Sequence, residues 1–71
     1  MVNSHYLKYI IHRNGDTVEE LAKHLGITRV TLSAKINNKT EFKLSEIVKI
    51  KKRYRMAEHQ CRKAFDEEEA S

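Results

Sequence analysis

Apolar residues recur at the three- and four-residue spacing of an α-helix along most of this 71-residue chain. The clearest stretch runs from residue 17 to residue 37, where two short apolar stripes lie on either side of a glycine. Such a pattern predicts two short helices joined by a tight turn. The first stripe consists of Val18, Leu21, Ala22 and Leu25, and the second of Leu32 and Ile36.

Capping residues indicate where these two helices begin and end. Thr17 is a good N-cap for the first helix, and Glu20 three residues later completes a capping box. Gly26 can adopt the left-handed conformation that ends a helix without a side-chain penalty. Thr28 is a second N-cap, and Ile27 before it is placed to pack on the next helix as a hydrophobic staple.

A small residue lies at the expected contact between the two helices. Ala22 is four residues before Gly26, where the helices have to touch. A helix, a tight turn and a second helix in this layout form a helix-turn-helix, whose second helix lies in the major groove of DNA. An ordinary helical hairpin in a bundle is the alternative interpretation of the same residues.

The expected outer face of the second helix is polar and basic, with no long apolar patch. The guanidinium of Arg29 can bond a guanine edge through two hydrogen bonds, a hydroxyl can read several bases, and Val30 suits a thymine methyl. The short polar and basic residues at 37–40 are placed for phosphate oxygens at the helix end. The residues assigned to the outer face are Arg29, Val30, Thr31, Ser33, Ala34 and Lys35.

Residues 17–37 resemble the helix-turn-helix of the lambda-repressor-like domain found in phage Cro and CI regulators. The resemblance covers residues 3–55, and the Asn-rich turn, Phe and fourth helix at 37–47 are similar to small phage proteins of that superfamily. It implies a compact five-helix, all-α domain that controls the lysis–lysogeny switch in the bacterial cytoplasm. The chain is also similar to the short modulator-of-repression proteins of some temperate phages, which act with a CI-type repressor.

The motif assigns candidate binding residues by position. Val18 and Ala34 stand where many relatives carry glutamine or another polar residue that contacts bases. Few side chains are therefore expected to read base edges directly. The resemblance implies base-reading residues at Arg29, Val30, Thr31 and Ala34, and phosphate contacts at Thr17, Val18, Asn37 and Lys39. The further candidates for DNA or partner binding are Thr28, Lys35 and Lys43.

Two functions of different classes are compatible with this surface. In the first, the chain is an autonomous repressor that binds double-stranded operator DNA, with Arg29 and Thr31 reading base edges. In the second, the chain is an antirepressor or modulator, and the surface around Arg29, Val30 and Lys35 meets a CI-type repressor protein. We expect action with the repressor rather than alone, and a plain structural helical domain is a third alternative.

Two further helices are expected to support this pair, one over residues 4–13 and one over residues 44–54. Phe42 precedes the second of them and is expected to pin the connecting loop to the core. The basic run at 49–55 either contacts phosphates or is a solvated helix end. The residues expected to face the core are Tyr6, Leu7, Ile10 and Ile11 in the first helix, and Leu44, Ile47 and Val48 in the other.

A fifth helix is expected over residues 56–69, with a narrow apolar stripe. A helix with so little apolar surface is marginal in isolation. It either packs on the core of the chain itself or waits for a partner that binds through Met56, Phe65 and the acidic residues. The stripe consists of Ala57, Cys61, Ala64, Phe65 and Glu68.

The charge distribution divides the chain into a basic domain, residues 1–65, and an acidic C-terminal tail, residues 66–71. The net charge of the whole chain is +4, but residues 1–65 hold 14 Lys and Arg against 6 Asp and Glu, a net charge of +8. A basic body favours binding of a polyanion such as DNA. An excess of lysine that only keeps a small protein in solution is the alternative.

Several function classes are disfavoured by what the sequence lacks. No stretch approaches the roughly 20 apolar residues of a membrane span, and no charged leader with a following apolar run indicates export. The single Cys61 cannot form an internal disulfide and suits a reducing cytoplasm. The four His and one Cys lack metal-ligand spacing, so we expect no metal, cofactor, catalytic residue or small-molecule substrate.

Overall fold

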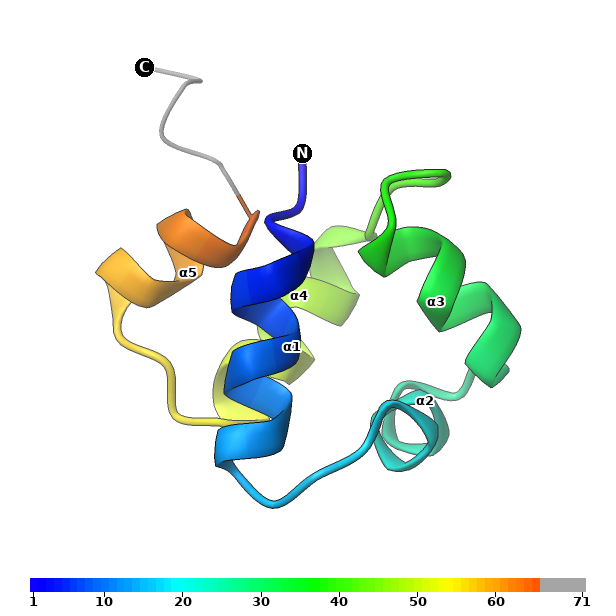
Figure 1. Cartoon of the computed structure of the whole chain (residues 1–71), viewed down its shortest axis with the longest axis horizontal. Coiled ribbons are helices and arrows are strands. Elements are labelled where there is room, and N and C mark those ends of the chain that lie inside the picture. Colours follow the sequence, from blue (N-terminus) through cyan, green and yellow to red (C-terminus); the bar gives the residue numbers. More distant parts are fainter. Residues whose placement is uncertain (66–71) are drawn as a thin grey trace.

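The computed structural model describes residues 1–65, which form five α-helices and no β-strand (Figure 1). The all-α prediction and the order of the helices are confirmed for these residues. The fifth helix begins two residues later than predicted, and residues 66–71, with the predicted acidic tail and the end of that helix, lie outside the described part. The helices are α1 (Ser4–Arg13), α2 (Val18–Leu25), α3 (Arg29–Ile36), α4 (Leu44–Arg53) and α5 (Glu58–Phe65).

The threonines before α2 and α3 bond to free N–H groups of the first helical turn, as predicted. Thr17 Oγ1 accepts from the Glu20 N–H and Thr28 Oγ1 from the Thr31 N–H, both at 3.1 Å between nitrogen and oxygen. The Thr17 N–H bonds to the carboxylate of Asp16. Only the threonine half of the predicted capping box is therefore formed, because the Thr17 N–H donates to Asp16 and not to the Glu20 carboxylate.

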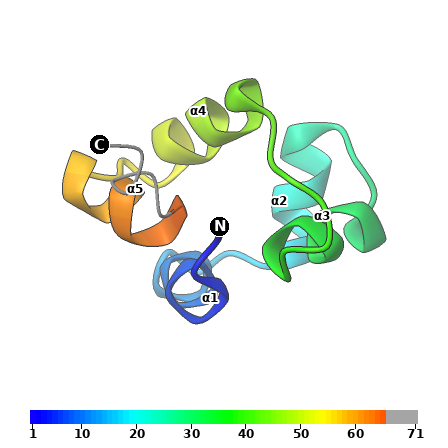
Figure 2. The ribbon, with the colours of Figure 1, turned by 90° about the horizontal axis from the view of Figure 1, so that it is seen from above.

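The helices surround one apolar core. α1 lies opposite α4, α5 lies at one end of the fold, and α2 and α3 lie at the other end (Figure 2). The predicted inner stripes of α1, α2 and α3 are confirmed, with Tyr6 and Val18 partly buried at the edge of the core. Burial of such side chains is the main stabilising contribution in a small domain. The buried core consists of Leu7, Ile10, Ile11, Leu21, Ala22, Leu25, Leu32, Ile36, Ile50, Tyr54, Met56, Cys61, Ala64 and Phe65.

The buried face of α4 differs from the prediction. Leu44 and Val48, which were expected to face the core, are 74 % and 40 % exposed, whereas Ile50 is fully buried. Glu46 is buried four residues before Ile50, because its carboxylate forms an ion pair with a side chain of α3. Because Glu46 faces inward, the buried side of α4 differs from the side predicted from its apolar residues. Of the three predicted residues, only Ile47 packs against the core.

α5 packs on the core of the domain itself. Cys61, Ala64 and Phe65 of its predicted stripe are buried, as is Met56 before the helix. The Phe65 ring packs edge-on against the ring of Phe42, with ring centroids 5.5 Å apart. The anchoring role predicted for Phe42 is confirmed. The interpretation in which Met56 and Phe65 wait for a partner is wrong, because the domain already covers both side chains.

Asp16 connects the turn before α2 to the end of α4. Its carboxylate accepts hydrogen bonds from Arg53 Nε at 2.8 Å and from the Tyr54 hydroxyl at 2.6 Å. The bond from Arg53 is the largest cause that lowers the pKa of Asp16 from 3.8 to about 2, against the opposing effect of burial. Burial and the same carboxylate raise the pKa of Tyr54. Arg53, part of the basic run, therefore has a structural partner.

Replacing Asp16 with asparagine is expected to lower the free energy of unfolding near pH 7 by about 1–2 kcal/mol, since the charged partner of Arg53 is lost. The pKa of Asp16 is depressed in the fold, so its contribution is present above about pH 4, the unfolded value, and disappears as the pH falls towards the folded value of about 2. Denaturant titrations of both proteins at pH 7 and pH 2 test this. Glu58→Gln, at an exposed ion pair with Arg62, is the control that should change little.

Candidate functional site

The turn between α2 and α3 is fixed by the backbone. Gly26 has φ +76°, its N–H bonds to the Lys23 carbonyl at 3.1 Å, and the Ile27 N–H bonds to the Ala22 carbonyl at 3.0 Å. These two bonds form a Schellman motif, which ends α2 and requires a left-handed residue at the glycine position. The sequence prediction for Gly26 is confirmed, and only Thr28 separates this closed turn from the start of α3.

Small and branched apolar residues hold α3 against α2. Ala22 is buried in α2, and Leu32 of α3 is fully buried. Ile27 is partly buried and packs against the same core. A small residue at a helix contact lets the two backbones approach closely. The α2–α3 unit is therefore held from the inside, and the opposite side of α3 is left for solvent.

Five of the predicted residues come together along a groove of about 410 Å³ on the outer side of α3. Val30 is 80 % exposed, Arg29 is exposed at the start of the helix, and Ala34 is partly buried between them and the helix end. Ser33, assigned from the sequence to the outer face, also lines it. The α3 groove consists of Arg29, Val30, Ser33, Ala34, Asn37 and Lys39.

Six of the predicted residues do not line the α3 groove, and four of these lie at the starts of α2 and α3. Thr28 and Thr31 are exposed at the start of α3, but their hydroxyls bond to each other at 2.9 Å. Thr17 and Val18 lie at the start of α2, where the threonine hydroxyl is used in capping and the valine packs against the core. The Thr17 and Thr28 hydroxyls and the Val18 side chain are thus used within the fold, whereas Thr31 only accepts from Thr28 and keeps its hydroxyl proton for a ligand.

Lys43 is exposed immediately before α4 and lies outside the groove. Its side chain remains available, while its N–H bonds to the Glu46 carboxylate. It adds a positive charge to the chain segment that follows α3.

Lys35 was predicted on the outer face, and this prediction is wrong. The residue is 7 % exposed, and its ammonium donates to Glu46 Oε1 at 3.0 Å and to the Glu41 carbonyl at 3.1 Å. Position 35 is three residues after Leu32 and next to Ile36, so it shares the inward side of α3. A lysine can take that position because its long stem packs among apolar atoms while its charge finds a partner. The one sequence feature that could have indicated an inward Lys35 is the acidic residue in the first turn of α4, Glu46.

The pair of Lys35 and Glu46 is charged in the fold. Burial alone would raise the pKa of Glu46, but the hydrogen bonds from the Lys43 N–H and from the Lys35 ammonium together lower it below its usual value. The ammonium also lies 6.0 Å from the centroid of the Phe42 ring, inside the fold and away from solvent. The α3 groove therefore has one cationic side chain fewer than the sequence predicted.

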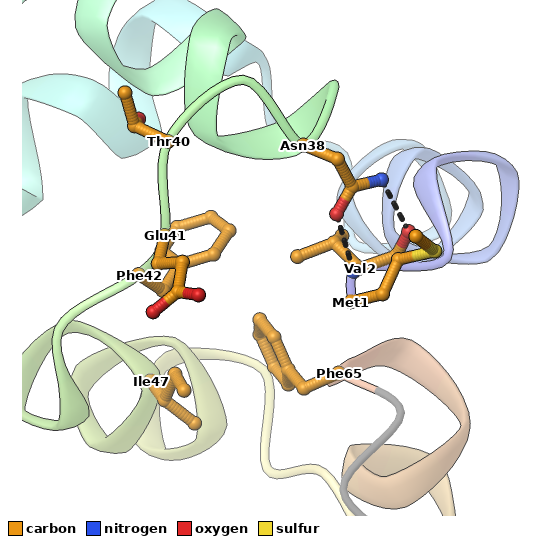
Figure 3. A pocket seen from close by; sticks show the side chains of 8 residues that line it. All are labelled: Met1, Val2, Asn38, Thr40, Glu41, Phe42, Ile47 and Phe65. Carbon is orange, nitrogen blue, oxygen red and sulfur yellow. Dashed lines mark hydrogen bonds between the residues drawn. The ribbon is translucent and has the colours of Figure 1, made fainter.

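A second groove, of about 380 Å³, was not predicted from the sequence (Figure 3). It lies at the C-terminal end of α3, and the side chains of Val2, Phe42 and Phe65 point towards it from three separate parts of the chain. Asn38, with φ +65°, borders it and bonds to both the N–H and the carbonyl of Val2, at 2.6 and 2.9 Å. Its lining offers no nucleophile paired with a base.

Within residues 1–65 no group of three or more His, Cys, Asp or Glu is close enough to hold a metal ion. None of the helices described has the length and apolar character needed to cross a bilayer. The α3 groove therefore remains the candidate site on which sequence and structure agree best.

Comparisons with known proteins provide no relative for this surface. No family model, no curated protein and no solved structure matches the chain. The interpretation of the α3 groove consequently depends on its geometry and charge.

Proposed function

We propose that this chain is a phage-type transcription regulator with a lambda-repressor-like helix-turn-helix, which acts at operator DNA together with a CI-type repressor. The observation that carries the proposal is the outward side of α3: a capped helix whose exposed residues form one groove directly after a closed turn. An ordinary bundle hairpin would not need to leave this face uncovered. Such a regulator would work in the cytoplasm of the bacterial host.

The dimensions and charge of α3 favour DNA as one target. An α-helix with its side chains is roughly 10–12 Å across, which fits the width of the major groove of B-DNA. Arg29 at its start can bond a guanine edge, and Asn37 and Lys39 at its end can bond phosphate oxygens. The net charge of +8 over residues 1–65 attracts a polyanion.

The composition of the groove favours a protein partner in addition. Val30 and Ala34, in its middle, have no hydrogen-bonding side chain and can read only methyl groups. Thr31, a predicted reader, accepts a hydrogen bond from the Thr28 hydroxyl, so that its own hydroxyl can read a base mainly as a donor. With so few free readers, high specificity for an operator requires contacts from a second protein, whereas an exposed valine suits the apolar centre of a protein interface.

Charge complementarity limits how a CI-type repressor would bind. Repressor surfaces that contact DNA are basic, and a body with a net charge of +8 is a poor match for one. The four acidic residues at 66–69 of the sequence would offset part of this repulsion. Either the chain and the repressor then bind the operator together, or the chain removes the repressor from the operator.

Light scattering after size-exclusion chromatography tests this proposal. The chain, the CI-type repressor of the same phage and an operator duplex are measured alone and in all combinations. We expect a defined complex of the chain with the repressor, whose formation changes the amount of repressor bound to the duplex. A repressor–operator complex whose mass and amount are unaffected by the chain would contradict the proposal.

Autonomous operator binding is the second candidate, favoured by the presence of Arg29, Asn37 and Lys39 in one groove. Gel shifts on the operator duplex and on a scrambled duplex, at several salt concentrations, distinguish it. Autonomous binding predicts sequence preference without the repressor and an affinity that falls steeply with salt, as phosphate contacts release counterions. Equal and weak binding to both duplexes would eliminate this candidate.

A further inference from the structure

The buried ion pair between α3 and α4 joins four separate points of the chain. Lys35 comes from the last turn of α3, and its ammonium bonds to Glu46 Oε1 and to the backbone carbonyl of Glu41. The same Glu46 oxygen accepts from the Lys43 N–H at 2.9 Å. Both charged side chains are 9 % exposed. The pair therefore holds two backbone positions of the connection between α3 and α4, as well as the two helices.

This connection carries residues of the candidate surface. Asn37 and Lys39 line the α3 groove, and the segment 37–43 continues from them to α4. At its start Asn38 is clamped to both backbone groups of Val2, as Figure 3 shows. At its end the segment is fixed through the ion pair. Lys39 thus lies between two anchored points, and the position of its backbone depends on both.

Stability alone is a poor explanation for this pair. Removing two charges from water is costly, and a well-packed apolar pair of similar volume is often as stable or more so. An apolar side chain at position 35 would fill the same space beside Leu32 and Ile36. It could not bond the Glu41 carbonyl, and an apolar residue at 46 could not receive the Lys43 N–H. The directional bonds to the backbone are what the charged pair adds.

We infer that Lys35 and Glu46 are positioning residues, which hold the segment 37–43 so that Asn37 and Lys39 are presented to the phosphates of operator DNA. The inference rests on the proposed function of the α3 groove and assigns its geometry to a pair that touches no ligand. Lys35 acts from the inside of the molecule, in contrast to the phosphate-binding role that its charge suggests.

The test replaces the pair with apolar residues, in the variant Lys35→Met/Glu46→Leu. Glu58→Leu/Arg62→Met is the matched control, because it also removes one acidic and one basic charge, from an exposed ion pair of α5. Three quantities are measured for each protein: the denaturant midpoint, the amide hydrogen exchange of residues 39–43, and the affinity for an operator duplex and for the CI-type repressor of the same phage. Lys39→Ala is added to the wild-type and to the double-variant backgrounds.

We expect the double variant to keep the wild-type midpoint, while the Lys39 amide, which bonds to the Ala34 carbonyl, exchanges about tenfold faster or more. Affinity for the ligand that the wild-type protein binds is expected to fall about five- to tenfold, since Asn37 and Lys39 are no longer held in place. Lys39→Ala should then weaken binding in the wild-type background and much less in the double variant, because coupled residues are not additive.

A double variant with wild-type midpoint, exchange and affinity would overturn the inference, because packing alone would then explain the pair. So would an affinity that falls only together with the denaturant midpoint, since that pattern belongs to a merely structural role. If the double variant does not fold, Glu46→Gln decides: it removes the charge but keeps the shape, and it must accelerate exchange at the Lys39 amide. A wild-type protein that binds neither DNA nor repressor would refute the proposed function, while the exchange comparison still tests the positioning.

Discussion

Arg29→Ala is expected to weaken binding to operator DNA, alone or with the repressor, by about 10- to 100-fold, the range given by one bidentate contact to a guanine edge. Arg29 is exposed at the first turn of α3 and lines the α3 groove, and no described residue forms an ion pair with it within the fold. Its guanidinium is therefore available to a ligand. Fluorescence anisotropy with a labelled operator duplex measures the change.

The control for Arg29→Ala is Lys8→Ala, which removes the same charge from an exposed position on α1. If binding were only a general attraction between a basic protein and DNA, both variants would lose the same modest amount of affinity, and this loss would disappear at higher salt. If α3 reads the DNA sequence specifically, Arg29→Ala lowers the affinity for the duplex much more than Lys8→Ala does at every salt concentration. Equal losses would remove Arg29 from the site.

Leu32→Ala is expected to lower the free energy of unfolding by about 2–5 kcal/mol, because it leaves a cavity in the core. Leu32 is fully buried where α3 packs on α2. The loss is a large share of the stability of so small a domain, so the variant should be substantially unfolded near physiological temperature. Circular dichroism during urea titration measures it.

Val30→Ala is the matched control for Leu32→Ala, two residues away on the same helix. Val30 is 80 % exposed, so its truncation should change the free energy of unfolding by less than about 0.5 kcal/mol. The same substitution is expected to weaken the complex with a repressor, since it removes apolar surface from the middle of the groove. Similar stability losses for the two variants would mean that α3 is rotated from the orientation described.

Local features of this fold were predictable from the sequence, because the interacting groups lie close together in the chain. Thr17 and Thr28 cap helices through N–H groups three residues ahead, and Gly26 ends α2 through carbonyls three to five residues behind. The helical order and the inner stripes of α1 to α3 follow from the same short-range periodicity. The candidate groove was largely predictable for the same reason.

Features that depend on distant partners were not predictable. Lys35 was assigned to the outside because a lone lysine on a short helix ordinarily faces solvent, and its partner Glu46 lies eleven residues ahead. The inward turn of Glu46 in its turn exposes Leu44 and Val48, whose apolar character alone had placed them in the core.

The clamp between Asn38 and Val2 and the groove beside it depend on residues 36 positions apart. Neither a turn signal nor a periodicity connects the start of the chain to the end of α3. The packing of the helices around the core and the hydrogen bond from the Ser4 hydroxyl to the Ile36 carbonyl bring these segments together, and both are properties of the whole fold.

The most direct test of the central claim, that the outer side of α3 meets another macromolecule, is a map of backbone amide shifts by nuclear magnetic resonance. The labelled protein is titrated with the operator duplex and with the DNA-binding domain of the CI-type repressor. We expect the largest shifts at Arg29, Val30, Ser33 and Lys39, with α1 and α5 little changed. Shifts confined to α1 and α5, or no shifts with either ligand, would contradict it.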